Sequence, residues 1–312
     1  MSSPEFRVGQ SSVQKISEMD LNGFTATQLL PDFHLTLLEQ HPEWVDPRTY
    51  DLATGHVLMS VHTWLVRHEG KIILIDTGAG NDKERSTLKV LDHLHHPYLE
   101  RLAAAGVRPE EVDYVLLTHI HADHVGWNTQ WDGKKWVPTF PNATVICSEL
   151  EWNYAASLAA GDEAAQAAAK AQAGLGEPIR TPIAGVFTDS MEPLAASGRL
   201  KRVRVDGSEV LPGIRFLPAA GHSIDHAVIS LTSGQSEALF GGDIMHHPFE
   251  VHDTNLVSTF CEFPEAARTV RQRFLRHAAE TGATYFSSHF PDTSAGKITE
   301  AEGKYTWTFL SD

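Results

Sequence analysis

Three histidines and an aspartate stand within six residues of one another and have the spacing of a metal-binding cluster. His119, His121, Asp123 and His124 directly follow the apolar run of residues 115–117, which is typical of a buried strand. Neutral imidazole and carboxylate are ligands that suit zinc and related divalent ions. Side chains at i and i+2 of an extended segment point the same way, so the first two histidines can hold one ion. The last two residues are placed to hold a second ion.

Further motifs follow in an order that resembles a known family. The cluster has the form His-x-His-x-Asp-His, and Ile75-Asp76-Thr77-Gly78 stands upstream of it. Downstream stand Gly221-His222-Ser223, Gly241-Gly242-Asp243 and Ser288-His289-Phe290. These motifs resemble the metallo-β-lactamase superfamily of hydrolases over roughly residues 60–290. Within it, the chain is most similar to the branch that includes lactonases, arylesterases and methyl parathion hydrolase-like enzymes.

The resemblance implies a fold and a metal centre. The implied fold is an αββα sandwich, in which two mixed β-sheets lie face to face between helices. The implied centre holds two divalent ions, with zinc preferred and manganese, iron or cobalt as alternatives. Its two ligand sets are His119, His121 and His222 for one ion, and Asp123, His124 and His289 for the other, with Asp243 bridging both. Two further residues are implied to orient the ligands without binding metal, namely Asp76 and His226.

Catalysis is expected to involve Asp123, Asp243 and His246. A hydroxide that bridges the two ions would be the nucleophile, since metal-bound water has a pKa near 7. His246 stands three residues after the bridging aspartate, where homoserine-lactone hydrolases of this superfamily commonly have tyrosine. A histidine there can polarise a carbonyl or protonate a leaving alkoxide. The alternative is that it only supports the metal-binding loop.

Large aromatic residues close to the ligands are candidates for the substrate pocket. Trp127 and Trp131 follow the first cluster, Phe249 follows His246, and Phe290 directly follows the last ligand. Aromatic side chains at the mouth of a metal site would favour an apolar substrate. The competing interpretation is that these rings are ordinary core residues.

The chain of 312 residues is expected to form a single domain. An N-terminal extension is predicted over about residues 1–55, and a helical insertion over about residues 150–195. Alternating apolar residues predict a hairpin over residues 60–76. Spaced leucines predict a helix over residues 86–106.

Composition and charge indicate which partners and which cellular location to expect. The net charge of −15 argues against a nucleic-acid partner, because binding to phosphates requires clustered lysine and arginine. No apolar run is long enough to span a membrane, and no signal peptide is recognised, so a cytoplasmic protein is expected. The two cysteines are expected to be reduced thiols. The family resemblance suggests a possible homodimer.

The leading functional hypothesis is a dinuclear metal-dependent hydrolase that opens a small hydrophobic lactone or ester. A phosphotriesterase-type hydrolase is an alternative, because a phosphoryl oxygen can take the place of the carbonyl oxygen. A glyoxalase II-like thioester hydrolase shares the metal pattern, although the C-terminal end lacks the basic patch usual for glutathione. A mononuclear iron sulfur dioxygenase is less favoured, since it would need fewer ligands than this chain offers.

Overall fold

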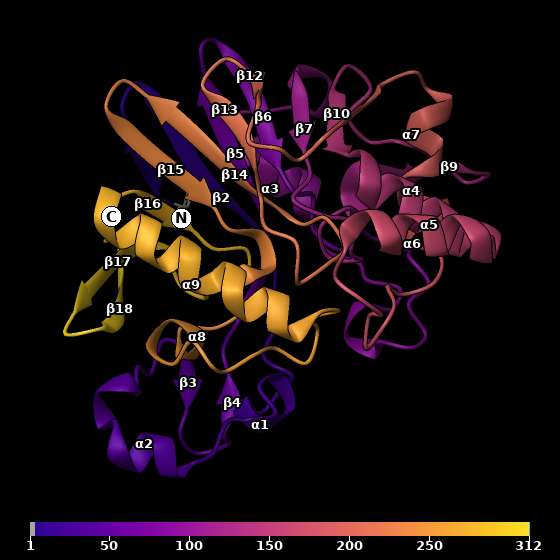
Figure 1. The fold of residues 1–312 in the computed structure, drawn as a ribbon. Helices are drawn as coiled ribbons and strands as arrows, with labels where there is room; N and C mark the ends of the chain where they lie inside the picture. Colours follow the sequence, from indigo (N-terminus) through magenta and orange to yellow (C-terminus); the bar gives the residue numbers. More distant parts are fainter. Residues whose placement is uncertain (1–3, 312) are drawn as a thin grey trace.

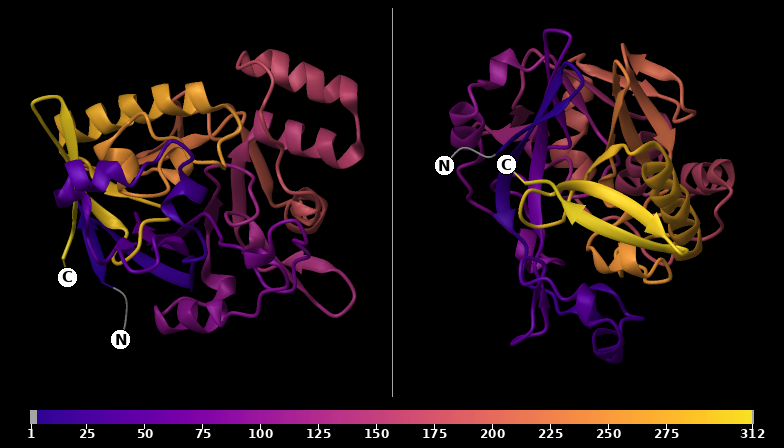
Figure 2. Two further views of the ribbon diagram at one scale, coloured as in Figure 1. Left: turned by 90° about the horizontal axis from the view of Figure 1, so that it is seen from below. Right: turned by 90° about the vertical axis from the view of Figure 1, so that its left-hand side faces the viewer.

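Two large mixed sheets form the framework of the protein in the computed structural model, which describes residues 4–311. The first sheet has seven strands in the order β1 (Glu5–Val8), β2 (Ser11–Asp20), β5 (Ser60–His68), β6 (Lys71–Ile75), β7 (Tyr114–Leu116), β10 (Thr144–Ser148) and β11 (Leu200–Val203). The second sheet also has seven, in the order β12 (Glu209–Leu211), β13 (Ile214–Pro218), β14 (Ala227–Ser233), β15 (Ser236–Phe240), β16 (Thr284–Phe286), β17 (Ala295–Ala301) and β18 (Lys304–Phe309). The right-hand view in Figure 2 shows the two sheets side by side.

Strand alternation explains why the sheets pack face to face. Trp64 and Val66 of β5 belong to the apolar cluster between the sheets, whereas Leu65 belongs to the cluster on the outer face. In β15, Phe240 faces the other sheet and Leu239 faces outward, onto a cluster that includes residues of α9 (Pro264–Thr281). Successive strand residues point to opposite faces, so both faces of each sheet are buried. Helix α9 crosses the outer face of the second sheet in Figure 1. The predicted αββα sandwich is therefore confirmed.

The remaining helices lie around the sandwich, and those that contain Leu102, Ala155, Val186 and Leu194 share the apolar cluster on the outer face of the first sheet. They are α1 (Ala26–Leu29), α2 (Thr36–Gln40), α3 (Tyr98–Ala104), α4 (Glu149–Ala160), α5 (Glu163–Ala173), α6 (Val186–Ser190), α7 (Glu192–Ala196) and α8 (Phe249–His252). Single-turn 3-10 helices are η1 (Pro42–Trp44), η2 (Lys89–Leu91), η3 (Pro109–Glu111), η4 (Gly126–Asn128) and η5 (Gly242–Ile244). Two short hairpins pair β3 (Tyr50–Asp51) with β4 (His56–Val57), and β8 (Thr129–Trp131) with β9 (Trp136–Pro138).

The two segments that were expected to lie outside the common fold have different structures. The N-terminal extension supplies β1 and β2 to the first sheet, and its later part packs against α8, where Phe33 stacks on Phe249 with ring centres 4.9 Å apart. The predicted insertion contains α4 to α7, and Figure 1 shows these helices together beside β9 and β10.

One predicted helix is much shorter than expected. Residues 86–106 contain a helix only from Tyr98 to Ala104, preceded by the single turn η2. Pro97 occupies the N-cap position, and proline disfavours helical backbone in the residue before it. The leucines upstream of Pro97 therefore lie in irregular segments.

Two expectations on composition can be compared with the structure. Cys147 and Cys261 are buried free thiols, as expected. Within residues 4–311, no helix combines the length and the apolar character needed to cross a membrane.

Candidate metal centre

Loops at the ends of strands from both sheets deliver the predicted metal ligands to one place. The first cluster follows β7 of the first sheet, and Asp76 follows the neighbouring strand β6, which runs parallel to β7. In the second sheet, His222 lies in the loop after β13, Asp243 follows β15, and His289 follows β16. The ends of neighbouring parallel strands meet at one edge of a sheet, which explains why residues so far apart in sequence converge.

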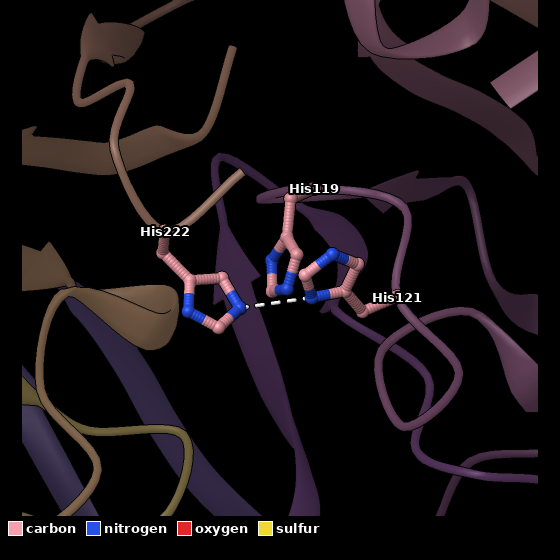
Figure 3. Close-up of side chains that lie close together, drawn as sticks. All are labelled: His119, His121 and His222. Carbon is pink, nitrogen blue, oxygen red and sulfur yellow. Dashed lines mark hydrogen bonds between the residues drawn. The ribbon is translucent and has the colours of Figure 1, made fainter. Parts of the chain in front are cut away.

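The potential ligand atoms form four overlapping groups, of which two match the predicted sets. Asp243 belongs to the other two, with His119 and His124 or with His222 and His246. His119, His121 and His222 form one group, and Asp123, His124 and His289 form another, each with ligand atoms within 4.8 Å of one another. Figure 3 shows the three histidines of the first group converging, with His121 Nδ1 2.8 Å from His222 Nε2. The structure therefore brings together all seven side chains that were predicted to bind metal, in the predicted grouping.

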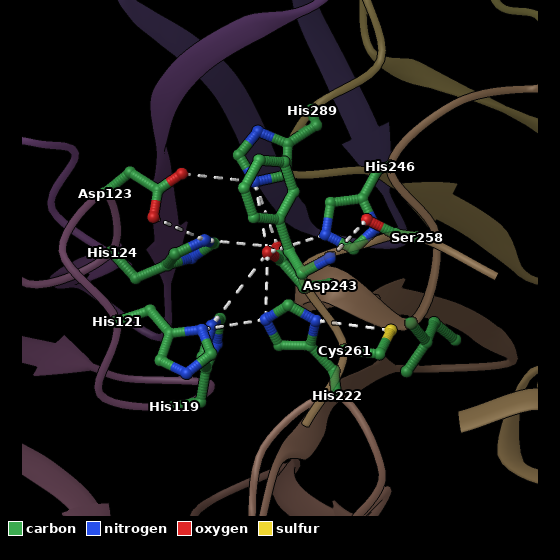
Figure 4. A network of polar contacts seen from close by, with 12 residues as sticks. His119, His121, Asp123, His124, His222, Asp243, His246, Ser258, Cys261 and His289 are labelled. Carbon is green, nitrogen blue, oxygen red and sulfur yellow. Dashed lines mark hydrogen bonds and ion pairs between the residues drawn. The ribbon is translucent and has the colours of Figure 1, made fainter. Parts of the chain in front are cut away.

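The carboxylate of Asp243 lies close to histidines of both groups, and both of its oxygens are near His289. Its Oδ1 lies 3.1 Å from Nε2 of both His124 and His289, and its Oδ2 lies 3.3 Å from Nε2 of His222. Figure 4 shows this carboxylate at the centre of the network. Such a position between the two groups is the one that a bridging ligand requires.

Several polar atoms in this centre are buried and have no hydrogen-bond partner. They are His119 Nε2, His124 Nε2, Asp243 Oδ1 and both ring nitrogens of His246. Burying unpaired polar atoms is costly, and a group of them that converge on one volume indicates a ligand. Burial holds the pKa values of His119 and His222 well below the usual range, which keeps their rings in the neutral form that binds metal. The residues present thus fit two divalent ions.

In two of the predicted histidine ligands, a hydrogen bond to the ring nitrogen that points away from the centre fixes the orientation of the imidazole. His124 Nδ1 donates to Asp76 Oδ2 at 2.9 Å, and His289 Nδ1 donates to the carbonyl of Ser60 at 3.0 Å. Both rings therefore direct Nε2 toward Asp243. Carboxylates and carbonyls that hold the second nitrogen of a histidine are typical of metal sites.

Asp76 and His226 occupy the supporting positions that were predicted for them. Besides His124, Asp76 accepts hydrogen bonds from the backbone N–H and the hydroxyl of Thr118, both at 2.8 Å. Its φ angle of 53° directs the carboxylate into the base of the ligand loop. His226 Nε2 accepts the backbone N–H of Asp243 at 2.9 Å. Each residue thus fixes the backbone beside a predicted ligand.

Two buried glutamates contact the ligand loops, and the sequence analysis missed both. Glu262 accepts a hydrogen bond from His121 Nε2 at 2.9 Å, which leaves Nδ1 of that ring directed into the centre. Glu151 of α4 accepts from the hydroxyl of Ser223 at 2.5 Å and from the N–H of Asp225 at 2.8 Å. Neither glutamate belongs to a local motif, and their partners lie 141, 72 and 74 residues away, so the sequence carries no short-range signal for them.

His246 lies beside the predicted bridging carboxylate. Its Nε2 is 3.3 Å from Asp243 Oδ2, and its backbone N–H donates to Glu250 Oε2 at 2.5 Å. Burial disfavours the charged form of the ring, but the carboxylates of Asp243 and Glu250 outweigh this effect and raise the pKa of His246 to about 9. Glu250 is in turn held by Arg271 at 2.7 Å. The carboxylates of Asp243 and Glu250 therefore flank the ring, although neither ring nitrogen makes a hydrogen bond to a described residue.

A cavity of about 450 Å³ opens onto these groups. Its lining includes Asp123, Asp243 and His246. Its apolar walls come from distant parts of the chain and contain Leu21, Phe24, Met59, Leu88, Val90, Leu91, Ile183 and Phe260. A mainly apolar cavity with a few convergent polar groups is typical of a site for a small molecule.

The aromatic residues that were predicted to line this cavity lie elsewhere. Trp127 is buried, and its Nε1 donates to Glu18 at 2.7 Å, while its ring stacks on Tyr98. Phe249 and Phe290 are fully buried in the core against Phe33 and Trp307. Trp131 is exposed and lines a neighbouring cavity that shares Thr87, Ile183 and Ala184 with the first. None of the four residues therefore lines the cavity at the metal centre, because being next to a ligand in sequence does not determine where a side chain points.

Two hydroxyacylglutathione hydrolases are similar in sequence to part of the chain. A hydroxyacylglutathione hydrolase from Aeromonas hydrophila is 33% identical over 102 residues, which cover 33% of this chain and 31% of the relative. The match thus spans about a third of that relative's length. A second hydroxyacylglutathione hydrolase, from Aeromonas salmonicida, is 32% identical over 77 residues.

Solved structures resemble the chain over its whole length. The hydrolase AbOPH of the beta lactamase superfamily has a TM-score of 0.77 and 25% identity, and the match covers 100% of this chain and 99% of the other. The dizinc quorum-quenching lactonase AidC, solved with a hexanoyl-homoserine product, has a TM-score of 0.76 and 19% identity, covering 100% and 98%. The family model of the metallo-β-lactamase superfamily matches residues 57–289. The chain therefore belongs to the metallo-β-lactamase superfamily.

Proposed function

We propose that this protein is a dinuclear metal-dependent hydrolase that opens a small hydrophobic lactone or ester. The observation that carries the proposal is the position of His246 and Asp243, which lie beside two groups of metal-binding side chains in the lining of a mainly apolar cavity. Zinc is the preferred ion, because most of the ligands are imidazoles and the rest are carboxylates.

The reaction adds water across the acyl carbon–oxygen bond. Two bound divalent ions would lower the pKa of water and polarise the substrate carbonyl. The water oxygen forms the new bond to the acyl carbon, the bond to the alkoxy oxygen breaks, and a proton moves to that alkoxide. The proton transfers are carried out by side chains of the protein.

The carboxylates and His246 handle the protons. Asp123 is more exposed than the other predicted ligands of its group, with 20% side-chain exposure, and can accept a proton from the attacking water. Asp243 lies between the two groups of predicted ligands, and its Oδ2 is 3.3 Å from His246 Nε2. His246 Nε2 donates the proton to the leaving alkoxide, which is the general-acid role that a histidine beside the reacting group can fill.

Cavity shape and relatives favour the carbonyl substrate over a phosphoryl one. The apolar walls suit an acyl chain, and burial of such a chain contributes about 0.8 kcal/mol per methylene. Lactonases are among the proteins with the same fold, including AidC. These two features support a lactone or ester with a short apolar chain.

Thioester hydrolysis is the second candidate. It is favoured by the similarity to hydroxyacylglutathione hydrolases over a third of the chain. The same centre can attack a thioester carbonyl, since only the leaving atom changes from oxygen to sulfur. A thiolate leaves without a proton, so this candidate predicts little dependence on His246.

A substrate panel separates these functions. Zinc-loaded protein and a His246→Ala variant would be assayed with an aryl ester, a δ-lactone, an acyl homoserine lactone, a phosphotriester and a glutathione thioester. We expect turnover of esters or lactones that falls about 100-fold in the variant, within the range for loss of a general acid. Turnover of the thioester or phosphotriester alone would refute the proposal. The zinc content of the variant would be compared with that of the wild type. Equal zinc content shows that the lower turnover comes from the missing imidazole and not from loss of metal.

A further inference from the structure

Arg180 is the one lysine or arginine side chain in the lining of the catalytic cavity, as far as residues 4–311 describe it. It lies in the loop between α5 and α6 and is half-buried. No ion pair among the described residues includes it, whereas the nearby Glu177 pairs with Lys170. The guanidinium therefore remains available to pair with an anionic group of a ligand.

The chain holds this side chain in place against one wall of the cavity. Nη1 of Arg180 donates to the carbonyl of Thr259, and the guanidinium carbon lies 5.2 Å from the ring centre of Phe260. The preceding backbone N–H, that of Ile179, donates to the carbonyl of Glu262 at 2.9 Å. Both anchors join Arg180 to the segment that contains Glu262, the partner of His121. The guanidinium is therefore oriented before any ligand binds.

Most of the hydrogen-bonding capacity of Arg180 stays available. A guanidinium has five N–H donors, and a single hydrogen bond to a described residue uses one of them. Among the acidic residues in the same lining, Glu262 accepts from His121 through Oε1, and its buried Oε2 has no hydrogen-bond partner among the described residues. Asp123 and Asp243 face the histidines of the metal centre. Apart from the histidines of the centre, the remaining lining is largely apolar, and its hydroxyl side chains are those of Thr87 and Thr181.

We infer that Arg180 binds a carboxylate of the substrate that is distinct from the reacting ester group. The preferred substrates are then amphipathic esters or lactones with an apolar chain and one free carboxylate. Arginine matches a carboxylate with two parallel hydrogen bonds, and such charge-assisted pairs are stronger than neutral ones. This inference rests on the proposed hydrolase function and adds the charge of the substrate to it.

A matched pair of substrates tests the inference. 4-Nitrophenyl hexanoate and the 4-nitrophenyl monoester of hexanedioic acid have the same six-carbon acyl chain, and only the second ends in a carboxylate. Their kcat/KM values would be measured on zinc-loaded wild type, Arg180→Gln, Arg180→Lys and Arg204→Gln. Arg204 is a matched control, because it is exposed and lies outside the cavity.

The expected result is a selective loss. Arg180→Gln should lower kcat/KM for the hexanedioate monoester about 10- to 100-fold, in line with loss of hydrogen bonds to a charged group. The hexanoate ester should change less than about twofold, Arg180→Lys should retain part of the preference, and Arg204→Gln should change neither substrate. An equal loss on both esters, or no loss on either, would overturn the inference.

Binding of a non-reacting anion separates this inference from the proposed function. If wild type hydrolyses neither ester, the proposed function fails on these substrates, and the anion site is tested by calorimetric titration with hexane-1-sulfonate. Binding to zinc-loaded wild type that weakens about 10-fold or more in Arg180→Gln supports the site. Absence of binding, or equal binding to both proteins, rejects it.

Discussion

Glu262 provides a sharp test of how this metal centre is built. Its Oε1 accepts from His121 Nε2 at 2.9 Å, and the side chain is 1% exposed. His121 is the most exposed histidine of its group, at 16%, so packing alone constrains its ring least. Without the glutamate, His121 can rotate or change tautomer, and Nδ1 then no longer faces the first group. We therefore expect Glu262 to act as a positioning residue for one ion rather than as a ligand.

The size of the effect follows from this geometry. Loss of a partner that orients a metal-binding histidine typically costs about 10- to 100-fold in metal affinity, which is about 1.4 to 2.7 kcal/mol. Glu262→Ala should reach the upper end, because it leaves a buried N–H without an acceptor. Glu262→Gln keeps a carbonyl oxygen for His121 and should stay near the lower end. The ranking of the two variants is itself a prediction.

Zinc affinity is the appropriate readout, because activity alone would not distinguish positioning from catalysis. Each variant would be titrated against a chelator of known affinity, and the stoichiometry of bound zinc recorded. We expect one of the two zinc equivalents to weaken and the other to stay near the wild-type value. Glu265→Gln is a matched control, since Glu265 is exposed and pairs with Arg268. Unchanged affinity for both equivalents in folded Glu262→Ala would refute the reasoning.

Three further predictions concern stability. Removal of metal by a chelator should lower Tm by roughly 5 to 10 °C in calorimetry, because buried His119 Nε2 and Asp243 Oδ1 then lack partners; an unchanged Tm would argue against bound metal. Glu151→Ala should lower the free energy of unfolding by about 1 to 3 kcal/mol, since Ser223 and Asp225 lose their acceptor, whereas Glu149→Ala on the exposed side of α4 should change it by less than about 0.5 kcal/mol. Burial lowers the pKa of Lys83 from 10.5 to about 7 in the folded protein. Between pH 7 and pH 10.5 the unfolded chain therefore binds more protons than the folded protein. Lys83 should make the free energy of unfolding rise with pH in this range, by at most about 1.4 kcal/mol per pH unit. Urea unfolding at pH 7 and pH 9 should therefore show a smaller gain for Lys83→Met than for wild type, and an equal gain would contradict this assignment.

The arrangement of the centre was predictable because each ligand belongs to a short motif at the end of a strand. Period-two alternation after an apolar run indicated that His119 and His121 could hold one ion, whereas the family resemblance implied that His222, Asp243 and His289 join them. The αββα layers were predictable for a related reason, since the same motifs carry the family resemblance. The supporting positions of Asp76 and His226 came from that resemblance too.

The shape of the cavity was not predictable from neighbouring residues. Trp127 turns inward because Glu18, 109 residues away, accepts its indole N–H, and no local pattern indicates this contact. Phe290 follows a ligand directly, yet its ring is in the core against Trp307. The residues that do form the walls, such as Phe24 and Leu91, come from segments whose sequence gives no sign of a pocket. Their convergence depends on tertiary packing, which the sequence patterns do not describe.

The origin of each group in the site suggests which parts of the chain determine chemistry and which determine selectivity. The side chains predicted to bind metal lie on loops anchored to strands of the two sheets, so their positions depend on the common fold. Arg180 and Ile183 lie in the loop between α5 and α6, and Phe24 lies in the N-terminal extension. Changes in these segments leave the strand ends in place, because loops tolerate variation better than the scaffold that supports them. We therefore expect selectivity for the substrate chain and its charge to change independently of the hydrolytic step.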